Sequence, residues 1–270
     1  MEKVARVIDI EKEFRNSKSR FFRLIPQFAI SLLRRLVHED EMNMTIHLSR
    51  ELDGVPFVED VLRNWNVVIR INGGENIPVS GRFIFVANHP VGAIDALAFL
   101  CLIHRHLKSV ISPSNEMLGR IPNLRSVMVG INVFGKNTKK TAAELEELFS
   151  SDTPVMIFPS GEVSRRKNGI IRDPAWQKTF VTKAVQHNRD IIPVHISGRN
   201  SGLFYFVANL RKLLGIKMYL ETILLPREMM NQRNSTVVLK VGTPIPYQSL
   251  TGEKTHMEWA QSIKEIVYNL

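Results

Sequence analysis

The sequence predicts an α/β protein, with a three-layer sheet domain that follows N-terminal amphipathic helices. From about residue 66 onward, short apolar runs alternate with helix-like segments, which is the pattern of βαβ units. Several of these runs are apolar at every position, as in parallel strands that are buried on both faces. The 270 residues are 44% hydrophobic and 23% charged, a composition that favours a sizeable core over global disorder. We therefore divide the chain into a helical region, residues 1–65, and one α/β domain, residues 66–270.

The N-terminal region is predicted to hold several helices. Residues 1–20 are charged and predict a short helix. Residues 40–66 predict further short helices, with Gly54 and Pro56 as helix breakers. Between them lies an apolar stripe at helical spacing, in which Pro26 either kinks the helix or begins its second half. Such a helix lies in a bilayer interface or packs on the core, because both need the same stripe. The stripe consists of Phe21, Ile25, Phe28, Leu32 and Leu36, flanked by Lys18, Arg20, Arg23, Arg34 and Arg35.

The remaining elements follow from apolar runs and their punctuation. A turn is expected at Asn72-Gly73-Gly74, and Pro193, inside an apolar run, predicts an edge strand or a bulge. Strands are expected at 66–71, 82–87, 109–111, 132–134, 154–158, 191–196, 217–224 and 236–241, and helices at 94–107, 139–150, 174–187 and 255–269.

Residues 83–95 are the stretch around which the domain is organised. An apolar run from Phe83 to Ala87 stops at Asn88-His89-Pro90, because proline has no N–H to donate to a strand ladder. A helical pattern follows Asp95, so His89 and Asp95 flank a strand-to-helix turn. Open α/β sheets place their chemistry at this end of a strand.

A histidine and an aspartate in such a turn suggest proton transfer. A neutral imidazole takes a proton from an alcohol, and a carboxylate on its other nitrogen fixes the tautomer and stabilises the imidazolium. The chain has no Gly-x-Ser-x-Gly pattern, so we expect the substrate's own hydroxyl to attack. The alternative is that His89 is a turn residue and Asp95 an ordinary helix cap.

Two further strand ends carry candidate anion-binding groups. Gly135-Lys136 and Ser160-Gly161 each follow an apolar run, and Arg165 and Arg166 come shortly after the second pair. Glycine lets backbone N–H groups approach an anion, and arginine holds phosphate or carboxylate through its planar fork. The alternative is an ordinary turn with a solvated basic face. His195 is predicted to be structural, and no histidines stand at metal-ligand spacing, so we expect no metal site.

Charge and cysteine content restrict the partners and the compartment. A net charge of +10 and a pI of about 9.9 suit nucleic acid, anionic lipid headgroups or an acidic carrier protein. The single cysteine, Cys101, excludes an intrachain disulfide and suits a reducing compartment, where we expect it to be a small core residue. Neither a signal peptide nor a membrane span is evident, so we expect a cytoplasmic protein, soluble or resting on a membrane face.

Four short motifs spread over residues 66–246 follow one another in the order Asn88-His89 with Asp95, Phe134-Gly135-Lys136, Phe158-Pro159-Ser160-Gly161 with Ser164-Arg165, and Ile192-Pro193-Val194. In this order they resemble the motif blocks of the glycerolipid acyltransferase family, which includes the 1-acylglycerol-3-phosphate O-acyltransferases. Three departures are visible: the His–Asp spacing is one residue longer than usual, and Ser160 and Lys136 replace the usual glutamate and arginine. The Asn-His-Pro-x-Gly-x-x-Asp form resembles a bacterial subgroup that acylates ornithine and glycine lipids. Val241–Ile245 also resembles the closing strand of this family.

The resemblance implies a membrane-associated enzyme on the cytoplasmic face. It would move a fatty acyl group from acyl carrier protein or coenzyme A thioester to the hydroxyl of a lysolipid, without another cofactor. His89 would be the general base and Asp95 its partner. The implied substrate-binding residues are Asn88, Gly135, Lys136, Ser160, Gly161, Arg165 and Arg166, with backbone N–H groups near Gly135 or Ser160-Gly161 as oxyanion donors.

Two alternatives remain open on the sequence. One is a catalytically silent lipid-binding relative, because two of the four blocks are altered. The other is a basic nucleic-acid-binding protein, which the pI alone suggests. The chain has no recognisable nucleic-acid reader motif, so we expect no nucleic-acid partner.

Overall fold

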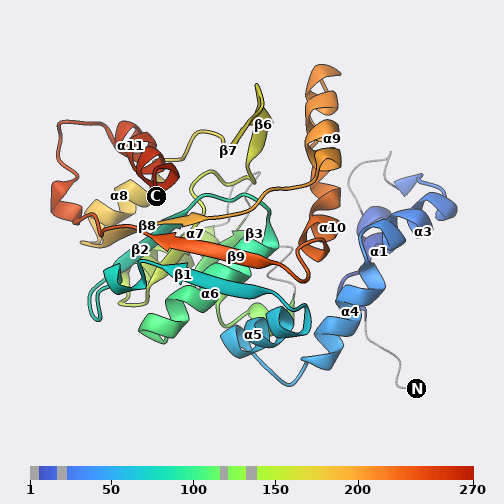
Figure 1. The fold of residues 1–270 in the computed structure, drawn as a ribbon, viewed down its shortest axis with the longest axis horizontal. Coiled ribbons are helices and arrows are strands. Elements are labelled where there is room, and N and C mark those ends of the chain that lie inside the picture. Colours follow the sequence, from blue (N-terminus) through green and yellow to red (C-terminus); the bar gives the residue numbers. More distant parts are fainter. Residues whose placement is uncertain (1–5, 17–22, 116–120, 132–138) are drawn as a thin grey trace.

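The computed structural model describes residues 6–16, 23–115, 121–131 and 139–270 (Figure 1). The helices are α1 (Ile10–Arg15), α3 (Gln27–Leu36), α4 (Glu39–Leu48), α5 (Gly54–Asn64), α6 (Ala93–Leu107), α7 (Lys139–Ser150), α8 (Thr179–Gln186), α9 (Gly202–Leu213), α10 (Leu225–Met230) and α11 (His256–Tyr268). The described residues also form the 3₁₀ turns η1 (Gly74–Asn76), η3 (Pro122–Leu124), η4 (Leu220–Leu224) and η5 (Tyr247–Ser249). The strands are β1 (Val68–Asn72), β2 (Phe83–Ala87), β3 (Ser112–Asn115), β4 (Met128–Ile131), β5 (Val155–Ile157), β6 (Arg165–Lys167), β7 (Ile170–Arg172), β8 (Asp190–Ile196) and β9 (Thr236–Val241).

The central sheet has five strands in the order β1-β9-β8-β2-β5. Strand β2 runs parallel to both neighbours, β8 and β5, while β9 pairs antiparallel with β8 and parallel with β1. The carboxyl ends of β2, β5 and β8 therefore meet at one edge of the sheet, where the predicted histidine follows β2. Strands β3 and β4 form a separate parallel pair, linked to the edge strand β5 by a bridge between Ile111 and Val155.

Helices cover both faces of this sheet, which gives the three layers that the sequence predicts. Because side chains alternate along a strand, β2 serves both cores. Phe83, Phe85 and Ala87 pack into the core on the α5 and α6 side. Ile84 and Val86 pack into the second core with α8 and α11. Every residue of β2 is buried, as the continuous apolar run predicts.

Several element predictions were wrong. No strand forms at 217–224, where the chain makes the 3₁₀ turn η4, and helices α9 and α10 were missed. The helix expected from 174 begins only at Thr179, because the N–H groups of Trp176 and Gln177 bond to Gln261 and to the Pro159 carbonyl. The strand expected at 109–111 begins at Ser112, and the one expected at 132–134 lies outside the described residues.

Two proline predictions and one glycine prediction also need correction. Pro193 lies in β8, a central strand, rather than at an edge; beside it, two residues of β8 (192–193) face three residues after β9 (242–244), as in the predicted bulge. Its missing N–H falls in this irregular stretch, between the Val194–Val241 pair and the Ile191–Ile245 pair. Gly54 and Pro56 do not break a helix but lie in the first turn of α5, where proline's N–H is not needed.

In the N-terminal region, helix α5 packs on α6 of the domain, and α4 holds the segments that precede it. The Asn43 side chain accepts hydrogen bonds from the Val7 and Ile8 amides, and the buried Glu39 carboxylate pairs with Arg34 of α3 at 2.7 Å. Helix α3 begins directly after Pro26. Its Phe28 and Leu32 side chains are 76% and 67% exposed, so these two residues of the predicted stripe do not pack on the core, while Phe21 lies outside the described residues. No helix among the described residues combines the length and the apolar character that crossing a bilayer requires.

Candidate active site

His89 and Asp95 meet as the sequence predicts. The Nδ1 atom of His89 lies 3.0 Å from Oδ2 of Asp95, and the aspartate is completely buried. The histidine side chain keeps 17% of its surface exposed. A buried carboxylate on Nδ1 fixes the ring so that Nε2 is the nitrogen available to a substrate.

The longer His–Asp spacing is absorbed in the turn that carries both residues. Oδ2 of Asp95 also accepts hydrogen bonds from the Val91 and Gly92 amides, at 2.8 and 2.9 Å. Gly92 has φ +137°, a conformation that favours glycine. The carboxylate therefore holds the start of α6 and the imidazole at once, and the extra residue does not separate the pair.

The backbone of His89 is held by a segment far along the chain. Its carbonyl accepts a 2.7 Å hydrogen bond from the Ser164 amide, and its own amide donates to Oδ1 of Asp173 at 3.2 Å. The Ser164 hydroxyl donates to the same oxygen of Asp173, and the Trp176 indole donates to the other. Phe158 stacks on the imidazole, with ring centroids 4.0 Å apart.

Asp173 and Ser164 are site residues whose roles here the sequence did not predict. Both are buried, and Asp173 accepts from three different donors. Nothing local marks Asp173, because it follows an exposed hairpin and lies 84 residues from His89. The Asn168-Gly169 pair between β6 and β7, with both residues at positive φ, was a usable signal for that hairpin.

Arg165 directly follows Ser164 and lies in a cluster of charged and aromatic side chains. Its Nη2 pairs with Glu162 at 3.0 Å and with the fully buried Glu221 at 3.2 Å. The guanidinium also lies 5.6 Å from the centroid of the Phe204 ring. Among the described residues its Nη1 has no hydrogen-bond partner. Two carboxylates thus hold the cation in place and offset part of its charge.

The same cluster continues to Tyr219 and Arg211. The Tyr219 hydroxyl donates to Glu162, and this hydrogen bond, with burial as a smaller cause, raises the pKa of the tyrosine. Arg211 pairs with Glu221 at 2.8 Å. The cluster therefore connects the β6–β7 hairpin to the segment of α9 and η4.

The other predicted site residues have different surroundings. Asn88 is buried, and its side chain bonds both backbone groups of Ile196, which joins the ends of β2 and β8. The Ser160 hydroxyl donates to the Glu162 carbonyl, and the Gly161 amide donates to that of Phe158. The Gly161 N–H is therefore engaged in the turn, which argues against it as an oxyanion donor.

The remaining residues singled out from the sequence do not contact the His89–Asp95 pair in the part of the chain that the structure describes. Arg166 is exposed on β6. Gly135 and Lys136 lie outside the described residues. His195 packs against Tyr268, and its pKa is lowered by burial and by the charge of Lys240, which suits the predicted structural role.

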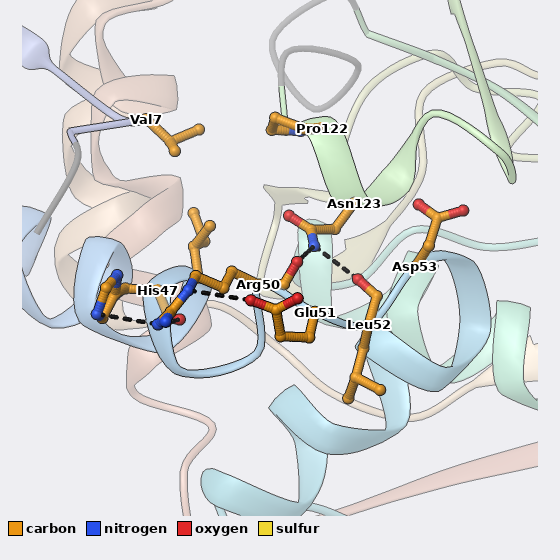
Figure 2. A pocket seen from close by; sticks show the side chains of 9 residues that line it. Val7, His47, Arg50, Glu51, Leu52, Asp53, Pro122 and Asn123 are labelled. Atoms are coloured by element: carbon orange, nitrogen blue, oxygen red, sulfur yellow. Dashed lines mark hydrogen bonds and ion pairs between the residues drawn. The ribbon is translucent and has the colours of Figure 1, made fainter.

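A cavity of about 410 Å³ lies elsewhere, between the N-terminal segment, the end of α4 and the η3 turn (Figure 2). Its walls include Val7, Ile46, Leu52 and Pro122. None of the residues that line it belongs to the predicted site. The site at His89 is therefore assigned from the residues that hold the imidazole and the backbone of His89, and this cavity is not part of it.

Comparison with known proteins shows the family that the sequence resembles. The acyltransferase family model matches residues 14–270. The lyso-glycine lipid O-acyltransferase of Bacteroides thetaiotaomicron is 38% identical over 265 residues, 98% of this chain and 97% of that protein. The protein of the same name from Phocaeicola vulgatus is 37% identical, over 98% and 95% of the two chains. The solved 1-acyl-sn-glycerophosphate acyltransferase of Thermotoga maritima is 17% identical, with a TM-score of 0.48, over 91% of this chain and 97% of that one. The chain therefore belongs to the acyltransferase family.

Proposed function

We propose that this acyltransferase moves a fatty acyl group from a thioester of acyl carrier protein or coenzyme A to the hydroxyl of a lyso-glycine lipid. Two relatives named lyso-glycine lipid O-acyltransferase, similar over nearly their whole length, support the acceptor class. One structural observation carries the chemistry. The buried Asp95 carboxylate lies 3.0 Å from His89 Nδ1 at the carboxyl end of β2.

In the proposed reaction, Nε2 of His89 accepts the proton of the acceptor hydroxyl as that oxygen attacks the thioester carbonyl carbon. Asp95 stabilises the imidazolium that forms. The tetrahedral intermediate then collapses, the carbon–sulfur bond breaks, and the imidazolium returns its proton to the departing thiolate. The products are the ester and the free thiol, and no acyl-enzyme forms.

Arg165 is the proposed anchor for the anionic end of the acceptor. Glycine that is joined to a lipid through its amino group keeps a free carboxylate. Nη1 of Arg165 is buried and has no hydrogen-bond partner among the described residues, while Nη2 is held by Glu162 and Glu221. A charge-assisted hydrogen bond from Nη1 to the carboxylate would orient the acceptor. Lys136 and Arg166 are proposed as additional cations.

The enzyme is proposed to work as a peripheral protein on an anionic membrane, on the cytoplasmic face. The net charge of +10 favours that surface, and the exposed Phe28 and Leu32 of α3 provide an apolar contact. A lipid acceptor with its acyl chain in the bilayer would then reach the site without leaving the membrane.

The test uses purified protein with an acyl thioester and two acceptors, a lyso-glycine lipid and 1-acylglycerol 3-phosphate, in detergent. We expect the O-acylated glycine lipid by mass spectrometry, and no product with the His89→Ala variant. Transfer to the phosphate acceptor alone would contradict the acceptor class. Binding of lyso-glycine lipid without turnover by the parent protein would instead support the catalytically silent alternative.

A further inference from the structure

Helix α9 carries apolar side chains on two opposite faces. Its inner face is buried and includes Phe204, Tyr205 and Ala208. Its outer face is exposed to solvent, with Phe206 at 62% and Leu213 at 84%. The spacing of three, four and seven residues places the outer side chains in one stripe. This outer face of α9 consists of Leu203, Phe206, Leu210, Leu213 and Leu214.

A helix on a folded domain needs only one apolar stripe, the one that faces the core. The outer face therefore adds nothing to the fold, and a contiguous apolar surface of this kind marks an interaction site. The apolar surface continues past the helix, because Ile216 and Met218 are also exposed.

The charged residues within the sequence segment that contains α9 are all of one sign. Residues 198–220 contain no aspartate or glutamate and four basic residues, Arg199, Arg211, Lys212 and Lys217. Arg211 is turned inward to Glu221, whereas Lys212 and Lys217 are exposed next to the apolar side chains. Apolar side chains with lysines beside them match the acyl and headgroup layers of an anionic bilayer.

The charge pattern also argues against a second copy of the chain as the partner. A two-fold contact through this face would bring like charges together without an anion from residues 198–220 to offset them. Anionic lipid is the partner that satisfies both the apolar stripe and the lysines.

We propose that the outer face of α9 docks on an anionic bilayer and thereby sets the orientation of the site toward the membrane. The orientation of the site toward the membrane rests on the proposed function, whereas the docking of α9 does not. The inner face joins α9 to the site, because Phe204 lies against Arg165 and Arg211 shares Glu221 with it. In Figure 1, α9 stands out from the sheet beside the β6–β7 hairpin, and α3 lies on the same side in this view.

The test measures binding of the full chain to vesicles of equal parts phosphatidylcholine and phosphatidylglycerol. The variant Phe206→Ser/Leu213→Ser should bind at least about tenfold more weakly, because two large apolar contacts are lost. The variant Lys212→Gln/Lys217→Gln should lose about fivefold per lysine, which corresponds to about 1 kcal/mol each, and this loss should vanish with pure phosphatidylcholine. The matched control is Val79→Ser/Ile266→Ser, which removes exposed apolar side chains outside α9 and should bind like the parent.

Thermal melting of each variant separates docking from folding. Unchanged vesicle binding by Phe206→Ser/Leu213→Ser, or no binding by the parent, would overturn the proposal. So would a parent dimer in sedimentation that the same variant loses while vesicle binding stays intact. Turnover with a short-chain, monomeric lysolipid should be unchanged in this variant and should fall only with acceptor embedded in vesicles. Failure of the parent protein to acylate either acceptor would count against the proposed function. The docking proposal would then be judged by vesicle binding alone.

Discussion

The imidazole of His89 stacks on the phenyl ring of Phe158, with centroids 4.0 Å apart and an angle of 18° between the planes. The two residues follow neighbouring strands, β2 and β5, which run parallel. Phe158 is itself tilted against Phe99 of α6, at 5.8 Å. The ring is therefore held in plane by packing and along one edge by Asp95, so that it has little freedom to turn away from the acceptor.

We predict that Phe158→Ala lowers kcat by about tenfold to hundredfold, because a loose imidazole is out of line with the hydroxyl for much of the time. KM for the acceptor should change little. Phe158→Tyr, which keeps the ring, is the control and should retain most of the rate. A normal kcat in Phe158→Ala would mean that Asp95 alone orients the histidine.

Asp173 is predicted to be a positioning residue that acts through the backbone of His89. Asp173→Ala removes all three hydrogen bonds that the carboxylate accepts, including the one from the His89 amide, and kcat should fall about tenfold with little change in KM. Trp176→Phe removes a donor to the same carboxylate without touching His89. It should lower the melting temperature but leave kcat nearly unchanged at temperatures where the protein is folded. Equal losses of kcat in both variants would reduce Asp173 to a purely structural role.

Arg165 should govern acceptor binding rather than the chemical step. Loss of one charge-assisted hydrogen bond in Arg165→Ala should raise KM for the lyso-glycine lipid by about tenfold to hundredfold, with kcat largely retained. Arg165→Lys should recover part of this loss, because it keeps the charge but not the fork. Lys167→Ala, an exposed change on the same strand, is the control. An unchanged KM in Arg165→Ala would mean that the arginine does not bind the acceptor and serves only in the ion pairs with Glu162 and Glu221.

Cys101 should be inert in the folded protein. Burial in α6 raises the pKa of its thiol to about 12, so at pH 8 it is an uncharged thiol without access to reagents. A thiol-specific colour reagent should label less than a tenth of the protein within an hour at pH 8, as an order-of-magnitude expectation, and all of it in denaturant. Rapid labelling of the native protein would show that α6 opens or is packed differently.

The parts of the site that the sequence predicted are those that lie close together along the chain. His89 and Asp95 belong to one turn, so spacing and residue type sufficed to pair them. Phe158 reaches the histidine because β2 and β5 are neighbours, and Asp173 because the β6–β7 hairpin folds back onto the site. Local pattern could have indicated the hairpin turn, but neither the pairing of β2 with β5 nor the place where the hairpin packs.

The fold was predictable to a similar degree. The buried strand β2 and the helix α6 have simple apolar patterns and were placed within a residue or two. Helix α9 was missed because its two apolar faces together give no single helical stripe. The apolar residues near 217–224 suggested a strand, whereas the Glu221 pairing with Arg165 and Arg211 fixes a tight turn there.

The central claim is that His89 is the base that deprotonates the acceptor hydroxyl. The most direct measurement is the acyl-transfer rate of folded His89→Ala at saturating lyso-glycine lipid and acyl thioester. We predict a loss of about 10²- to 10⁴-fold in kcat, the range for a general base, with circular dichroism and acceptor binding unchanged. A kcat within a few-fold of the parent would contradict the account.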